Sequence, residues 1–151
     1  MAFRFQLWLR GITMLLALQF LLGIWVNLFG TFPRTTSLAT ALTYTGDPAL
    51  TAHMLLAVVI VVVGFVVAVV AFLGSAPDPR LRWILAGGLI STLFAYEWGV
   101  RLILADFASN TDSFWMAVGF IAAVAFYGIA QTMVAAADAS RSRPLRPAKV
   151  A

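Results

Sequence analysis

Cysteine is absent from the chain, and histidine and charged residues are scarce. The 151 residues include one histidine, and only 11% of them are aspartate, glutamate, lysine or arginine. Without thiols the chain forms no disulfide, no thiolate metal site and no iron–sulfur cluster. One histidine among scattered carboxylates has no metal-ligand spacing, so we expect no metal site. Glycine-rich phosphate loops and serine–histidine–aspartate arrangements are also missing, which favours a non-catalytic role over an enzyme and leaves no catalytic residue to name.

Apolar residues, in contrast, make up 62% of the chain, far above the usual content of a soluble domain. Four apolar runs reach or exceed the roughly 18 to 20 residues needed to cross a bilayer. They cover residues 11–29, 52–73, 83–104 and 114–137. Because the runs are continuous rather than alternating, they predict helices, which satisfy their own backbone hydrogen bonds in lipid. The sequence predicts an all-α integral membrane protein, an antiparallel four-helix bundle over residues 1–138.

Basic residues indicate which side of the membrane each end of the chain faces. With the N-terminus inside, one basic residue, Arg34, falls in an external loop, and eight fall on the cytoplasmic side: Arg4, Arg10, Arg80, Arg82, Arg141, Arg143, Arg146 and Lys149. The positive-inside rule therefore predicts a multi-pass protein of the cell membrane with both termini cytoplasmic. These residues flank helix ends, where they contact lipid headgroups, so the pI near 10.4 indicates no nucleic-acid partner.

The connections between the runs differ in length. The first, residues 30–51, is long enough to be a functional lid or to hold local structure, and its SLATALTY stretch predicts a short interfacial helix. The other two are short, so the last three spans should be antiparallel neighbours. Residues 139–151, basic and rich in proline and small residues, are predicted to be a disordered cytoplasmic tail.

Small residues recur at intervals of four along the third run. They are Gly87, Ser91, Ala95 and Gly99. In lipid, helices associate through close backbone approach and polar contacts, because lipid chains are as apolar as leucine. This small-residue ridge is therefore predicted to pack against another helix, either in this chain or in a partner.

The stretch AYEWGVR places Glu97 and Arg101 inside the third run. Four residues apart on one helical face, the two side chains can neutralise each other as an ion pair. Ionisable residues inside a span are functional candidates by default, so Glu97 is a candidate for a small transporter or a proton-responsive protein. The structural alternative is an internal pair that only fixes the orientation of the helix.

The single histidine, His53, begins the second run on the predicted external side. A histidine on a bundle helix binds haem b iron in some proteins, and in others it hydrogen-bonds a neighbouring helix. Methionine ligation opposite His53 is open to Met14, Met54 or Met116. We expect no cofactor from the composition, with haem b held by His53 as the alternative.

The stretch ALQFLLGIWVNLFGTFP, followed by AHMLLA at the head of the second run, resembles small bacterial four-helix membrane proteins of unknown function. Their layout is similar to half of a haem A synthase or a cytochrome-b-type bundle. The resemblance covers most of the chain in layout and rests on Asn27, Pro33 and His53. It implies a location in the bacterial inner membrane and a further histidine at the head of the fourth span, where this sequence has NTDSFWMAVGF.

Antiparallel packing of the runs brings four polar residues to a similar depth, namely Asn27, His53, Glu97 and Arg101. Since each polar group needs a partner in lipid, we expect one polar cluster in the outer half of the bundle, with Tyr96, Trp98 and Trp115 around it.

Three functions stay open at this point. They are a non-catalytic accessory subunit of a larger membrane complex, a haem b electron-transfer protein using His53, and a transporter using Glu97. The expected partners are the lipid bilayer and either other membrane subunits or a second copy of the chain.

Overall fold

The computed structural model describes residues 2–75 and 78–141. Its helices are α1 (Ala2–Phe29), α2 (Leu38–Leu42), α3 (Pro48–Val70), α4 (Pro79–Leu104) and α5 (Asn110–Arg141), and a wide turn, η1 (Ala71–Ser75), follows α3. No strand occurs in the described ranges. Four helices, α1, α3, α4 and α5, are long and apolar enough to cross a membrane. The predicted all-α bundle with four apolar spans is therefore confirmed.

Helix boundaries follow local capping chemistry more closely than hydropathy. Asp47 and Asp78 cap the first turns of α3 and α4 with their carboxylates, and a proline occupies the first helical position of each. At the end of η1, Gly74 turns the chain with φ 99°, a conformation that glycine adopts readily. Residues 139–141 of the predicted tail belong to α5, and residues 142–151, with Arg143, Arg146 and Lys149, lie outside the described residues.

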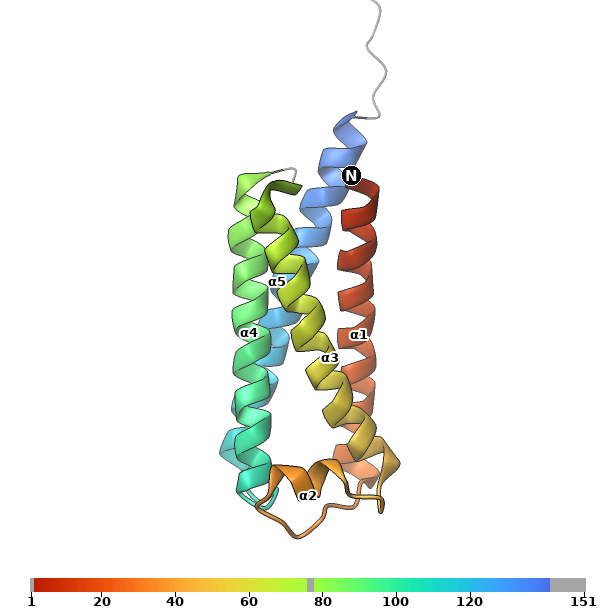
Figure 1. The fold of residues 1–151 in the computed structure, drawn as a ribbon, viewed down its shortest axis with the longest axis vertical. Helices are drawn as coiled ribbons and strands as arrows, with labels where there is room; N and C mark the ends of the chain where they lie inside the picture. The colour runs from red at the N-terminus through yellow and green to blue at the C-terminus, as the bar shows by residue number, and fades with distance from the viewer. Residues whose placement is uncertain (1, 76–77, 142–151) are drawn as a thin grey trace, which may run out of the picture.

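Consecutive long helices run in opposite directions, so α1 begins and α5 ends at the same end of the bundle (Figure 1). We call this the terminal end and the opposite one the α2 end, because α2 lies there. Around the bundle, α1 packs against α3 and α5, and α4 packs against the same two helices. The helices α1 and α4 therefore lie diagonally across from each other.

The terminal half of the bundle is closely packed. Its fully buried side chains come from all four long helices and include Leu9, Val67, Leu85 and Tyr127. A polar link also joins α5 to α1 here: the Gln131 side-chain amide donates to the Leu9 carbonyl at 2.9 Å and to the Thr13 hydroxyl at 2.7 Å. Because these polar atoms satisfy one another, they hold two helices in register without an unpaired group in lipid.

The small-residue ridge of α4 faces α5. A Cβ on Gly87 would lie 2.7 Å from the Phe126 ring, and a Cβ on Gly99 would lie 3.4 Å from the Met116 sulfur. From the other side, a Cβ on Gly119 would lie 2.8 Å from the backbone nitrogen of Ala95. The α4–α5 contact thus depends on glycine at positions where the helices approach closely, while Ser91 on the same ridge is half-buried.

Toward the α2 end, α3 diverges from α4 (Figure 1). Residues 30–47, which we call the strap, join α1 to α3 across this end and contain α2. The backbone amide of Thr35 donates to the Asp106 carboxylate at 2.7 Å, and the rings of Phe32 and Phe107 lie 4.9 Å apart. Asp106 and Phe107 form the turn after α4 with φ values of 55° and 57°, an uncommon conformation for residues other than glycine. The strap is thereby fastened to the α4–α5 turn.

Candidate functional site

A cavity of about 450 Å³ occupies the α2 half of the bundle, where the helices are farthest apart. All four long helices line it, and Leu38 and Leu42 of α2 line it from the strap. Most of the lining is apolar. The polar lining residues are Gln19, Asn27, His53, Thr92, Tyr96 and Ser113, and none of the lining residues is an aspartate, glutamate, lysine or arginine.

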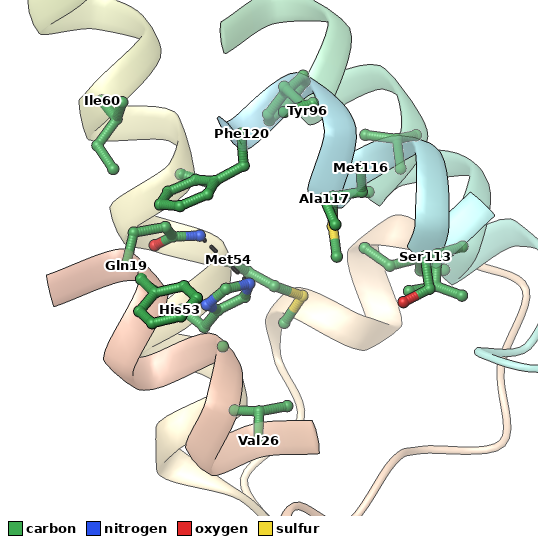
Figure 2. Close-up of a pocket in the computed structure, with 18 of the residues that line it drawn as sticks. Gln19, Val26, His53, Met54, Ile60, Tyr96, Ser113, Met116, Ala117 and Phe120 are labelled. Atoms are coloured by element: carbon green, nitrogen blue, oxygen red, sulfur yellow. Dashed lines mark hydrogen bonds between the residues drawn. The ribbon is translucent and has the colours of Figure 1, made fainter. Parts of the chain in front are cut away.

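Gln19 on α1 and His53 on α3 form a hydrogen-bonded pair in the cavity wall (Figure 2). The Gln19 side-chain nitrogen lies 3.2 Å from His53 Nε2. An amide nitrogen only donates, so Nε2 accepts, and the proton of the neutral imidazole sits on Nδ1. Both the Nδ1 atom and the Gln19 side-chain oxygen are buried without a hydrogen-bond partner. Such groups are uncommon in folded proteins and mark a place where a ligand group or a water is expected.

Gly23 makes room for the imidazole of His53. A Cβ at this position would lie 3.1 Å from His53 Cε1, closer than most such contacts in proteins. Gly23 and Gln19 are four residues apart and therefore lie on one face of α1. One helical face thus provides both the partner of the ring and the space that the ring occupies.

The start of α3 determines where His53 sits. The Asp47 carboxylate accepts hydrogen bonds from the backbone amides of Ala49 and Leu50, and from Thr31 in the strap at 2.8 Å. The amides of Thr31 and Leu50 hold the pKa of Asp47 below its usual value, and this effect outweighs desolvation, which raises the pKa. His53 then falls in the second turn of α3, facing α1.

Two methionines line the cavity near this pair. Met54 follows His53 on α3, and Met116 comes from the first turns of α5; Figure 2 shows their side chains on opposite sides of the open space. Ser113 lies one turn before Met116 and lines the α5 side as well.

The four residues expected in one polar cluster divide into two groups. Asn27 and His53 line the cavity together. Glu97 and Arg101 pair with each other on α4, with 2.9 Å between the Arg101 Nε and a Glu97 oxygen, and their side chains are 58% and 54% exposed. Neither charged residue lines the cavity, and no hydrogen bond or ion pair joins them to His53 within the described part of the chain.

The aromatic residues expected around that cluster divide in the same way. Tyr96 lines the cavity, whereas Trp98 and Trp115 pack together outside it with 6.2 Å between their rings. The Arg101 guanidinium lies 4.7 Å from the Trp98 ring centre, a cation–π contact that adds to its pairing with Glu97. The charged pair is therefore satisfied locally.

Metal and haem binding depend on different side chains. No group of three histidine, cysteine, aspartate or glutamate side chains in residues 2–75 and 78–141 could hold a metal ion. For haem, His53 and Met116 supply an imidazole and a thioether to the same cavity. However, Nε2 of His53 is hydrogen-bonded to Gln19, and the lining offers no cation to pair with the two haem carboxylates. The donor pair fits haem iron, whereas the charge of the cavity suits a neutral ligand better.

The pairing of Gln19 with His53 is the functional contact that sequence reasoning missed. Gln19 interrupts an apolar run that otherwise needs no polar side chain, and Gly23 follows it by one turn. A polar residue and a glycine on one face of a span are a signal for a polar partner on the neighbouring helix.

No protein-family model, curated protein or solved structure matches the chain. The resemblance to haem A synthase accordingly remains an expectation from the sequence, and the function is argued from the cavity alone.

Proposed function

We propose that the protein is a non-catalytic membrane protein that binds a small apolar ligand in the cavity beside Gln19 and His53. The observation that carries this proposal is the 450 Å³ space whose wall holds a buried hydrogen-bonded pair with two unpartnered polar atoms. Ligand sites are typically apolar spaces of about 300–1,000 Å³ with a few polar groups that fix orientation. This cavity has that size and that composition.

The terminal half and the α2 half have different tasks in this proposal. Close packing and the Gln131 link keep the terminal half rigid, while the α2 half leaves a space that its own side chains do not fill. Packed protein interiors contain few voids larger than a water molecule, so a space of this size is a feature to explain. Binding a ligand for storage, transfer or presentation to a membrane complex explains it without a catalytic residue.

Haem b is the second candidate ligand, and the observation in its favour is that Met116 lines the same cavity as His53. These two residues would hold the iron, and the group would supply electron-transfer chemistry when bound. Because no lining residue is cationic, the carboxylates of haem would have to face the α2 end or the headgroups.

The proposal is tested by purifying the protein from its native membrane in a mild detergent. We expect a colourless protein whose organic extract contains one enriched small molecule, and we expect Gln19→Leu and His53→Leu to reduce the amount bound. Leu18→Ala, on the exposed side of α1, is the matched control and should leave binding unchanged. An absorption band of haem that is lost in His53→Leu would select the second candidate, and an extract with no enriched molecule would contradict both.

A further inference from the structure

The cavity reaches the outer surface of the bundle between α1 and α5. Ile24 on α1 and Ile121 on α5 both line it, yet they are 42% and 67% exposed. Between them, the rings of Phe20 and Phe120 stack with 5.8 Å between their centres. Side chains that line a cavity and are also exposed mark its margin, so these four residues border an opening that faces the bilayer. We call this opening the side portal.

The α2 end, in contrast, is closed by bonded contacts. Thr35 donates to Asp106, Thr31 donates to Asp47, and the rings of Phe32 and Phe107 pack together. A ligand arriving from the aqueous phase would have to separate the strap from the α4–α5 turn and break at least the first and last of these contacts. At the side portal, it needs only to displace the ring contact between two phenylalanines.

The polar groups in the lining indicate the chemistry of the ligand. An ionised ligand group would lie in an apolar space without a formal countercharge, which is costly. The Nδ1–H of His53 is an unpartnered donor, and the side-chain oxygen of Gln19 is an unpartnered acceptor. Both atoms are covered in the present arrangement, so the imidazole must turn toward the cavity to donate to a ligand oxygen. A neutral molecule with a carbonyl oxygen beside an apolar chain satisfies these conditions.

We infer that the cavity is loaded sideways from the bilayer, through the side portal, by a neutral lipid that carries a carbonyl group. This inference rests on the proposed ligand-binding function and adds the direction of loading and the class of ligand. The carbonyl end lies at Gln19 and His53, and the chain extends between Phe20 and Phe120 toward the lipid. Prenyl quinones and diacylglycerols share this chemistry.

The absence of native cysteine allows the two routes to be blocked one at a time. Phe20→Cys with Phe120→Cys places a thiol pair across the side portal, and Thr35→Cys with Asp106→Cys places one across the strap. Thr13→Cys with Gln131→Cys joins the same two helices as the portal pair but in the closely packed half, so it is the matched control. Each pair is closed with a short thiol-reactive cross-linker, and its uncross-linked form is kept for comparison.

Each protein is stripped of bound lipid in detergent and placed in nanodiscs that contain a prenyl quinone, a diacylglycerol or only anionic phospholipid. Native mass spectra then follow the appearance of the bound lipid. We expect loading by at least one of the two neutral lipids, loss of loading when the portal pair is cross-linked, and unchanged loading for the strap and control pairs. Which neutral lipid loads identifies the source of the carbonyl.

Three results would overturn the inference. Loading that stops on cross-linking the strap but continues through a closed portal would show that the ligand comes from the aqueous side. Selective binding of the anionic phospholipid would show that the ligand class is wrong. In both cases the cavity still binds a ligand, so the proposed function survives. If no variant and no unmodified protein binds any lipid, the inference fails together with the proposed function.

Discussion

The side chains of Gln19 on α1 and His53 on α3 lie 3.2 Å apart in the cavity wall, and each keeps one buried polar atom without a partner. A hydrogen bond between two spans normally removes unsatisfied groups from lipid. This one satisfies half of each side chain and leaves the other half for a further contact. It links packing of the α2 half to binding of a ligand.

Replacing Gln19 should therefore affect stability as well as binding. In Gln19→Leu the imidazole loses its partner at Nε2, and leaving a buried polar group unsatisfied costs about 1–3 kcal/mol. We expect a lower midpoint of thermal unfolding in detergent for Gln19→Leu, and a partial recovery in the double variant Gln19→Leu with His53→Leu. If the double variant is no more stable than the single one, the two residues do not act as a pair.

Gly119 tests the close approach of α4 and α5. A Cβ at Gly119 would lie 2.8 Å from the backbone nitrogen of Ala95, and a helix backbone cannot easily move away. Overpacking of this kind costs about 1–3 kcal/mol, so Gly119→Ala should unfold more easily in detergent. Gly128→Ala lies on the same helix with no atom within 4 Å of its new Cβ and serves as the control. Equal unfolding midpoints for the two variants would contradict this packing of the ridge.

Acid should loosen the strap at the head of α3. The Asp47 carboxylate accepts three backbone hydrogen bonds, and its pKa in the folded protein lies below the usual 3.8. A carboxyl group with a depressed pKa contributes its full stabilisation above the unfolded pKa and loses it as the pH falls through the folded one. We expect faster hydrogen exchange at the Thr31 and Leu50 amides as the pH is lowered below about 3.8, relative to the intrinsic rate at each pH.

The control for the acid experiment is Asp47→Ala, which removes the carboxylate and with it an N-cap worth about 0.5–2 kcal/mol. In this variant the same two amides should already be poorly protected at neutral pH and should show no further loss of protection in acid. A variant that keeps full protection at Thr31 would show that the carboxylate does not fasten the strap.

The Glu97–Arg101 pair should contribute little to binding. Both side chains are exposed by more than half, lie outside the cavity and are four residues apart on one helix. Exposed ion pairs of this kind are worth at most about 1 kcal/mol. We expect Glu97→Gln to leave the amount of bound ligand unchanged and to alter the unfolding midpoint only slightly. Loss of ligand in Glu97→Gln would favour the transporter or proton-responsive function that the sequence suggests for this residue.

The sequence is sufficient to predict the bundle, because length, hydropathy and the spacing of small residues are local properties. The short helix in the SLATALTY stretch is also found, as α2 (Leu38–Leu42), since Ser37 caps it locally. Helix ends were less predictable, because the Asp78 cap starts α4 at Pro79, before the apolar run begins. Capping overrides hydropathy at such positions.

The candidate site was predictable only in part. Sequence depth alone places His53 and Glu97 at one level, but the rotation of α4 decides whether Glu97 faces inward, and that rotation is set by contact with α5. The ridge residues turn toward α5, which leaves Glu97 and Arg101 outside the cavity. The cavity itself depends on the divergence of α3 from α4, a long-range property that no local pattern carries.

The most direct test of ligand binding fills the cavity and weighs the protein. Ala117 lines the cavity on α5, whereas Ala125 lies on an exposed part of the same helix. Native mass spectra of Ala117→Phe and Ala125→Phe, both purified from the native membrane, are compared with that of the unchanged protein. We predict one bound small molecule on the unchanged protein and on Ala125→Phe, and a bare chain for Ala117→Phe. A bare chain in all three, or the same adduct on all three, would contradict the proposal that this cavity is a binding site.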